Sequence, residues 1–320
     1  MIPDELTICS TAQRIKGHIH RTPVLTCQTL NQLLQAEVFF KCENFQKAGA
    51  FKFRGATNGV LSLGEDEIQN GVCTHSSGNH AQALSLAARN RGIPAFIVMP
   101  ETSSRVKIEA VEHYGGKITF CKPTLAAREE TLVWIRSRTG ATEIHPYNDY
   151  RTIAGQATAA MELIEDVEDL DVILAPVGGG GLLSGTALSA YYFSAATKVI
   201  AAEPAMADDA FRSFYSGELV PSINPRTIAD GLLTSLGSLT FPIIRQHVHQ
   251  IVTVGEESII QAMRFIWERM KIIIEPSSAV PVAALFESAA KKDGSGFLVP
   301  GMRIGIILSG GNTDLSKLPW

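Results

Sequence analysis

The sequence Ala-Phe-Lys-Phe-Arg-Gly-Ala at residues 50–56 places Lys52 between two aromatic residues, Phe51 and Phe53, just before a run with helical character. Aromatic neighbours remove water from an ammonium group, and this desolvation lowers its pKa. A lysine that is often neutral can form a Schiff base with a carbonyl compound. The other interpretation is a surface lysine that lies along apolar neighbours. The stretch favours a nucleophilic Lys52 only if other motifs supply a binding site.

A second motif consists of four consecutive glycines after an apolar run. Residues 172–177 have the pattern of a buried strand, and Gly178, Gly179, Gly180 and Gly181 follow directly. Bare backbone amides can close around a phosphate there, helped by the positive end of the next helix. No Lys-Ser or Lys-Thr pair follows, so this is not a nucleoside triphosphate loop. We favour a phosphate site over a plain strand-to-helix turn, because such a turn rarely needs four glycines.

Two more stretches begin with serine where a predicted strand ends. Ser76-Ser77-Gly78-Asn79-His80 precedes a helix, so its hydroxyls and amides can converge on a carboxylate. Its simpler alternative is a helix N-cap. Ser309-Gly310-Gly311-Asn312 is either a turn or a way to direct the Ser309 hydroxyl at a ring nitrogen. Together with Lys52 and the glycines, these stretches resemble the parts of a pyridoxal phosphate site.

The composition is that of an ordinary globular protein. The 320 residues are 45% hydrophobic, which is enough to fill the cores of two domains. The net charge is −4, and the sequence has no long block of like charges. We therefore expect no binding to nucleic acid or to an anionic membrane. The five cysteines lack Cys-x-x-Cys spacing, so neither a disulfide framework nor a zinc site is expected. We find no signal peptide and no apolar run long enough to span a bilayer. A cytoplasmic location is therefore expected.

Strand and helix patterns alternate along the chain, which predicts α/β architecture with parallel strands. Residues 73–146 are expected to form a small domain nested in a large domain made of residues 1–72 and 147–320. Residues 208–242 look irregular and rich in loops. The predicted strands are 37–42, 71–75, 95–99, 117–121, 142–145, 172–177, 198–203 and 303–308; the predicted helices include 6–18, 79–91, 103–113, 126–137, 152–163, 256–271 and 276–289.

Six motifs occur in the order found in fold type II pyridoxal phosphate enzymes, and the sequence resembles that family over nearly its whole length. Besides the four stretches above, they include Thr227-Ile228-Ala229-Asp230-Gly231 and Glu275-Pro276-Ser277. Within the family the sequence is similar to the branch of serine racemases and serine/threonine dehydratases, with hydroxyaspartate dehydratases. The resemblance implies two open twisted α/β domains like those of the tryptophan synthase β subunit, pyridoxal 5′-phosphate as cofactor, and a homodimer.

The resemblance also implies roles for individual residues. Lys52 would form the Schiff base and then act as acid or base on one face of the substrate. Ser77 would either face Cα from the opposite side, as in serine racemases, or only bind the carboxylate; both interpretations stay open. The implied cofactor-binding residues are Phe51, Lys52, Asn79, Gly178, Gly179, Gly180, Gly181, Gly231, Glu275 and Ser309, and the implied carboxylate-binding residues are Ser76, Ser77, Asn79 and His80.

An acidic turn at residues 203–209 is a further candidate site. By itself, such a turn is usually solvated. Relatives in the racemase branch hold a structural divalent ion with a glutamate, a backbone carbonyl and an aspartate at this spacing. Glu203, Ala207 and Asp209 reproduce that pattern, and oxygen ligands suit Mg²⁺ or Ca²⁺. The resemblance thus implies a metal site.

The expected activity is removal of water and ammonia from serine, threonine or 3-hydroxyaspartate, giving a 2-oxo acid, together with serine racemisation if Ser77 is a second acid–base group. Hydroxyaspartate would need a cation for its second carboxylate, for which Arg128 and Lys122 are candidates. Arg54 and Arg151 are expected in structural ion pairs. Two alternatives are a β-replacement synthase of the cysteine synthase type and a non-catalytic amino acid sensor.

Overall fold

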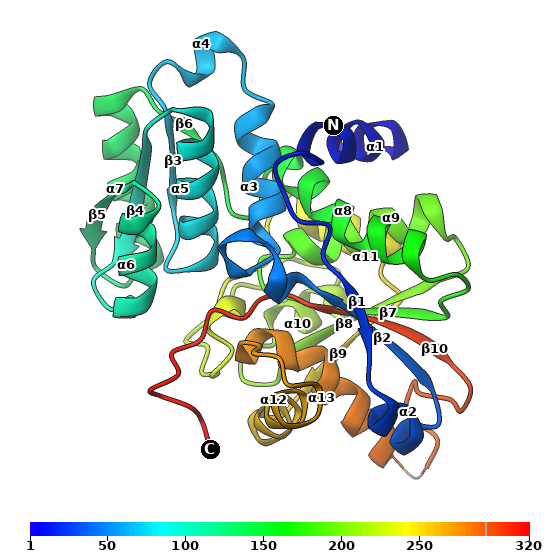
Figure 1. The fold of residues 1–320 in the computed structure, drawn as a ribbon. Helices are drawn as coiled ribbons and strands as arrows, with labels where there is room; N and C mark the ends of the chain where they lie inside the picture. The colour runs from blue at the N-terminus through cyan, green and yellow to red at the C-terminus, as the bar shows by residue number, and fades with distance from the viewer. Residues whose placement is uncertain (292) are drawn as a thin grey trace.

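The computed structural model describes residues 1–291 and 293–320, apart from the side chain of Leu125. The strands in these residues form two sheets, one of six strands in the order β1-β2-β10-β7-β8-β9 and one of four in the order β5-β4-β3-β6. Figure 1 shows the smaller sheet with its helices on one side of the molecule and the larger sheet on the other. No described helix is both long and apolar enough to cross a membrane.

The six-stranded sheet is parallel except for its edge strand β1. Its central strand β10 comes from the C-terminal end of the chain and pairs with β2 on one side and β7 on the other. The carboxyl ends of these parallel strands therefore meet at one edge. The strands are β1 (Val24–Thr26), β2 (Glu37–Cys42), β7 (Val172–Pro176), β8 (Lys198–Pro204), β9 (Gln250–Val254) and β10 (Arg303–Leu308).

Helices cover both faces of this sheet, with α8, α9 and α11 on one face and α12 and α13 on the other (Figure 1). Successive strand residues point to opposite faces. Ile306 thus packs with α12 and α13, while Ile307 packs with α8 and α9. The helices are α1 (Glu5–Ile15), α2 (Gln28–Leu34), α8 (Tyr150–Asp166), α9 (Gly181–Phe193), α10 (Asp209–Ser216), α11 (Thr240–His247), α12 (Glu256–Met270) and α13 (Pro276–Ala290).

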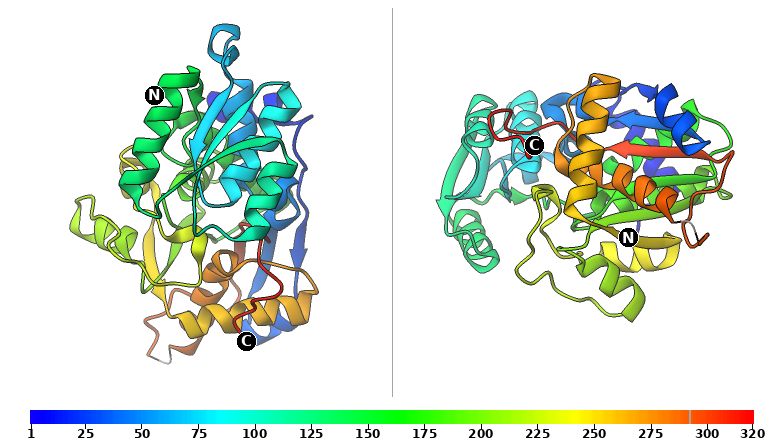
Figure 2. Two further views of the ribbon diagram at one scale, coloured as in Figure 1. Left: turned by 90° about the vertical axis from the view of Figure 1, so that its left-hand side faces the viewer. Right: turned by 90° about the horizontal axis from the view of Figure 1, so that it is seen from below.

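The four-stranded sheet is entirely parallel. Helix α5 packs on one of its faces and α7 on the other, as the two further views in Figure 2 also show. Helix α3 (Lys52–Leu61) lies between the two sheets and contributes Phe53, Ala56 and Val60 to the core beside α5. The remaining elements are β3 (Val72–His75), β4 (Ala95–Pro100), β5 (Gly116–Cys121), β6 (Thr142–Glu143), α4 (Glu65–Ile68), α5 (Asn79–Arg91), α6 (Arg105–His113) and α7 (Leu125–Thr139).

A buried group of charges joins α3 to the large sheet. The guanidinium of Arg54 binds Glu43 at 2.7 Å and Glu162 at 2.8 Å, and Lys41 binds Glu162 at 2.7 Å. Lys41, Glu43 and Arg54 have fully buried side chains, so each charge depends on its partners. The network fixes α3, and with it Lys52, relative to β2 and α8. It confirms the ion-pair prediction for Arg54; Arg151, likewise, binds Asp149.

The sequence located most elements but missed or misread several regions, among them α2 and α4. β2, α5 and β10 have the predicted bounds. Residues 208–242 were predicted to be irregular, yet they contain α10 and the start of α11. The edge strand β9, which pairs only with β8, was missed because its apolar run is short. All four strands of the smaller sheet lie within residues 72–143, so β3 begins one residue before the boundary predicted at 73, and the nested domain at 73–146 stays a prediction.

Candidate active site

Four predicted motifs meet at the carboxyl ends of parallel strands, where open α/β sheets bind ligands. Residues 76–80, called here the serine loop, follow β3, while residues 178–181, the glycine loop, follow β7. Ser309 follows β10. Its carbonyl accepts a hydrogen bond from the amide of Phe51 at 2.9 Å, and Ala50 and Gly310 form an isolated bridge. These bonds place the start of α3 beside the end of β10.

Lys52 begins α3 with its amine in a partly apolar setting. The amine donates a hydrogen bond to the carbonyl of Pro146 at 2.7 Å and lies 5.1 Å from the ring centre of Phe51 and 6.0 Å from that of Tyr147. Burial lowers its pKa to about 8, against the opposing charge of Glu275. The prediction that the ring of Phe53 flanks the amine is wrong. Phe53 is buried in the core beside α5, and the ring of Tyr147 lies near the amine instead.

The glycine loop can exist only without side chains. A Cβ on Gly179 would overlap the ring of Tyr147, and Cβ atoms on Gly178, Gly180 and Gly181 would lie 3.0, 2.8 and 2.9 Å from other atoms. Gly180 has a φ of +87°, a conformation that favours glycine. Among the described residues, none accepts a hydrogen bond from the amides of Gly178, Gly179 or Gly180, although these residues are buried. Such amides need an external acceptor.

The serine loop is tied to the large domain through Asn79. The Asn79 amide donates to both oxygens of Glu275, at 2.8 and 3.0 Å, and its oxygen accepts from Asn312 at 3.0 Å. The sequence assigned this amide to the cofactor's phenolic oxygen, whereas here it binds Glu275. Burial raises the pKa of Glu275 to about 7, helped by Asp230 and opposed by Lys107. Near neutral pH, the carboxyl group of Glu275 is therefore partly protonated.

The imidazole of His80 is not suited to bind a carboxylate. Its Nε2 lies 2.9 Å from the carbonyl of Ile144, so Nε2 carries the proton and Nδ1 is an acceptor. Burial lowers the pKa of His80 to about 3, which keeps the ring neutral. A neutral acceptor nitrogen does not bind an anion. If His80 contacts the carboxylate, only its backbone amide at the start of α5 can do so.

Hydroxyl groups cluster at Ser309 and Gly231. The hydroxyls of Ser309 and Ser278 lie 3.1 Å apart, and the Ser278 hydroxyl also accepts from the amide of Gly310 at 2.7 Å. The amide of Gly231 donates to the hydroxyl of Ser277 at 3.1 Å. The sequence missed Ser278, which lies directly after the Glu-Pro-Ser motif and holds Ser309 in place.

Two cations lie close to these motifs. Lys107 forms an ion pair with Asp230, and a Cβ on Gly78 would lie 2.9 Å from its Cδ. The positive charge of Arg128 helps to lower the pKa of His75 and partly offsets the rise that burial causes in the pKa of Tyr147. Its Nε is buried, and no described residue accepts a hydrogen bond from it. Lys122, the other sequence candidate for a second carboxylate, is exposed.

The two carboxylates of the acidic turn bind backbone amides at and near α10. Glu203 accepts from the amides of Ala210 at 2.9 Å and Phe211 at 2.8 Å, while one oxygen of Asp209 is buried without a described partner. Burial raises the pKa of Glu203 to about 9 and that of Asp209 to about 6. The described residues contain no cluster of three or more His, Cys, Asp or Glu side chains suited to a metal. Any ion here would need the carbonyl of Ala207 and water.

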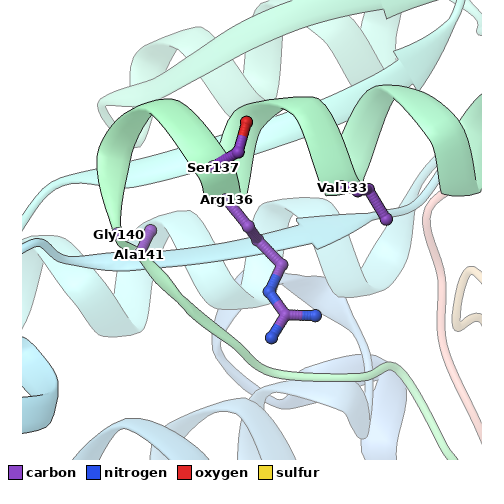
Figure 3. Close-up of a pocket in the computed structure, with 5 residues that line it drawn as sticks. All are labelled: Val133, Arg136, Ser137, Gly140 and Ala141. Carbon is purple, nitrogen blue, oxygen red and sulfur yellow. The ribbon is translucent and has the colours of Figure 1, made fainter.

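A separate open hollow lies on α7 and is unrelated to these motifs (Figure 3). None of its residues belongs to a predicted site. It is lined by Val133, Arg136, Ser137, Gly140 and Ala141.

Comparison with known proteins identifies the class. Residues 15–310 match the family described as pyridoxal-phosphate dependent enzyme, and the chain belongs to this family. The beta-hydroxyaspartate dehydratase of Paracoccus denitrificans (strain Pd 1222) is 49% identical over 319 residues, covering 100% of this chain and 99% of the dehydratase.

Solved structures agree. The crystal structure of serine racemase from Dictyostelium discoideum is 50% identical, with a TM-score of 0.90, and the match covers 98% of this chain and 99% of that one. The threonine deaminase of T.th. is 39% identical, with a TM-score of 0.91 and coverage of 98% and 100%. These findings confirm the predicted fold, cofactor and reaction class: this is a pyridoxal phosphate enzyme of the hydroxy amino acid dehydratase and serine racemase group.

The site fits pyridoxal phosphate. The unpartnered amides of the glycine loop suit its phosphate, and the amine of Lys52, with its lowered pKa, suits its aldehyde. Tyr147 lies close to both, which places the amine and the loop in one site.

Proposed function

We propose that the protein eliminates water from a β-hydroxy amino acid, whose unsaturated product is then hydrolysed to a 2-oxo acid and ammonia, with 3-hydroxyaspartate as the preferred substrate. The observation that carries the chemistry is the amine of Lys52, neutral at mildly alkaline pH, beside the unpartnered amides of the glycine loop. We assign Phe51, Asn79, Gly231, Glu275 and Ser309 to the surroundings of the cofactor ring, as the sequence implied.

Lys52 is the proposed base. When bound, pyridoxal phosphate withdraws electrons from Cα of the amino acid attached to it. The neutral amine of Lys52 then takes the Cα proton, and its hydrogen bond to Pro146 orients it. The serine loop holds the α-carboxylate through its hydroxyls and the free amides at the start of α5.

The role of Ser77 decides whether the enzyme also racemises. As a second acid–base group opposite Lys52, it would allow a proton to return on the other face of Cα. As a carboxylate ligand only, it would not. Ser77→Ala separates the two roles: loss of racemisation with surviving elimination supports the first, and equal loss of both supports the second.

The preference for hydroxyaspartate rests on Arg128 and on the 49% identical hydroxyaspartate dehydratase. A guanidinium recognises a carboxylate through paired hydrogen bonds. The Nε of Arg128 is buried and has no described acceptor, so binding a second carboxylate would satisfy it. Lys122 is exposed and has no comparable need for a partner.

A divalent ion between Glu203, the carbonyl of Ala207 and Asp209 is a further part of the proposal. The unpartnered, buried oxygen of Asp209 supports it, because an ion would stabilise the charge there. We also propose a homodimer in a reducing compartment such as the cytoplasm. The five free cysteines support that compartment, and light scattering of the cofactor-loaded protein tests the dimer.

A substrate panel tests the function. We expect 2-oxo acid and ammonia in equal amounts, fastest from 3-hydroxyaspartate, with serine and threonine slower. Oxo acid formed without an added thiol excludes a β-replacement synthase. No turnover of any of these substrates would instead favour an amino acid sensor. Lys52→Ala is the inactive control.

A further inference from the structure

We propose that His145 is a positioning residue for Lys52, acting through the backbone of residues 144–148, here called the proline turn. The inference rests on the proposed role of Lys52 as base. His145 has no predicted role in the sequence motifs, and it does not itself contact the amine. The carbonyl that contacts the amine belongs to Pro146, the next residue.

The ring of His145 closes the proline turn on itself. Its Nδ1 accepts the amide of Asn148 at 2.9 Å and the amide of Tyr147 at 3.3 Å. Both bonds need an unprotonated Nδ1, and so the tautomer with hydrogen on Nε2. Burial lowers the pKa of His145 to about 4, with the neighbouring His75 contributing, so the ring stays neutral near physiological pH.

Other bonds hold the turn in place from outside. His80 donates from Nε2 to the carbonyl of Ile144 at 2.9 Å, and Thr152 donates to the carbonyl of His145 at 3.0 Å. The side-chain oxygen of Asn148 accepts the amide of Leu239 at 2.8 Å. The turn is thus tied to α5, to α8 and to the segment before α11.

The same segment reaches the glycine loop. The hydroxyl of Thr240 and the amide of Gly237 both donate to the carbonyl of Gly179, at 2.8 and 3.3 Å. The ring of Tyr147, also in the turn, packs on Gly179. One short turn therefore sets the position of the Lys52 amine relative to the loop that is proposed to hold the phosphate.

The proline turn controls the direction of the lone pair on the Lys52 amine. A neutral amine has a single lone pair, and donating one N–H to Pro146 limits rotation about the Cε–Nζ bond. A shift of about 1 Å in a reacting group can cost about a hundredfold in rate. Without the Nδ1 acceptor, the amides of Tyr147 and Asn148 lose their partner and the carbonyl of Pro146 moves with them.

Two substitutions separate this role from simple packing. In His145→Asn the side-chain oxygen can take the place of Nδ1, whereas in His145→Gln the amide reaches toward the Nε2 position. We expect kcat to fall about ten- to a hundredfold in His145→Gln, with KM nearly constant and most of the loss recovered in His145→Asn. His249→Gln, at an exposed histidine, is the control.

Hydrogen exchange of the peptide that covers residues 144–149 gives a second readout that needs no turnover. The peptide should exchange at least about tenfold faster in His145→Gln than in the wild type and in His145→Asn, since an amide without its acceptor opens more easily. Equal losses in both variants, or no loss in His145→Gln, would overturn the proposal. If Lys52→Ala remains active, the proposed function fails, while the exchange result still reports on the turn.

Nitrogen-15 shifts of the wild-type histidines cover the case in which His145→Gln does not fold. At neutral pH they should show His145 with hydrogen on Nε2 only. Hydrogen on Nδ1 would contradict the proposal.

Discussion

Lys107 lies against Gly78 in the serine loop and forms an ion pair with Asp230, next to Gly231. Lys107 belongs to a helix on the smaller sheet, and Asp230 lies between β8 and β9 of the larger one. The Lys107 side chain is only 13% exposed, so its charge depends on this partner. The pair therefore fixes the serine loop in relation to the residues that are proposed to surround the cofactor ring.

Gly78→Ala tests this arrangement. The new Cβ would lie 2.9 Å from Cδ of Lys107 and 3.2 Å from its Nζ, so the lysine must move and the ion pair must weaken. We expect a KM increase of about tenfold, equivalent to about 1.4 kcal/mol of lost substrate binding, with a smaller change in kcat. Gly17→Ala is the matched control, since a Cβ there meets no atom within 4 Å. An unchanged KM in Gly78→Ala would contradict the arrangement.

Arg128→Met should change substrate choice. The variant keeps a long apolar stem but cannot bind a second carboxylate. We expect kcat/KM for 3-hydroxyaspartate to fall about a hundredfold, in line with the roughly 2–3 kcal/mol of a charge-assisted bond, and that for serine to fall much less. Lys122→Met should leave the ratio of the two substrates unchanged. Equal losses for both substrates in Arg128→Met would assign the arginine to the shared α-carboxylate.

The buried charges around Arg54 predict a large loss of stability. Glu43→Gln leaves part of a fully buried guanidinium without its counter-ion, so we expect the free energy of unfolding to fall by about 3–5 kcal/mol. Arg21→Gln, which breaks the two ion pairs of an arginine that is 53% exposed, should cost less than about 1 kcal/mol for each pair. Denaturant unfolding measures both. If Glu43→Gln lowered the free energy of unfolding as little as Arg21→Gln, the buried network would contribute no more to stability than a surface ion pair.

Chelation tests the proposed ion at Glu203 and Asp209. Removing a divalent ion present at about a hundredfold over its Kd should destabilise the protein by about 2.7 kcal/mol, lowering the melting temperature. Adding Mg²⁺ or Ca²⁺ should restore it. Asp209→Asn should no longer respond to either treatment. A melting curve that chelation leaves unchanged counts against the site.

Local patterns predicted many of the elements and three of the motifs because these three motifs each come after a buried strand. Ser76, Gly178 and Ser309 could therefore be placed at the carboxyl ends of strands from sequence alone, Ser76 in the smaller sheet and the other two in the larger one. The error at Phe53 has a simple cause. Phe53 lies inside α3, one position after Lys52, so its ring points to a different face and packs beside α5, whereas Phe51 precedes the helix and its ring lies near the amine.

The missed residues carry no local signal. Pro146, Tyr147 and Lys107 reach the site only through the packing of the smaller sheet against α3 and α5. Ser278 acts through a hydrogen bond between α13 and the end of β10. Nothing in the sequence around these residues distinguishes them from ordinary turn or helix positions.

The central proposal is that the amine of Lys52 binds the cofactor. Borohydride reduction of the protein loaded with pyridoxal phosphate, followed by peptide mass spectrometry, locates the modified lysine. Because burial lowers the pKa of Lys52 to about 8, its neutral form becomes the majority above that pH, and attachment should speed up as the pH rises through it. We expect the cofactor on Lys52; a stable adduct on another lysine, with Lys52 unmodified, would contradict the proposed enzyme.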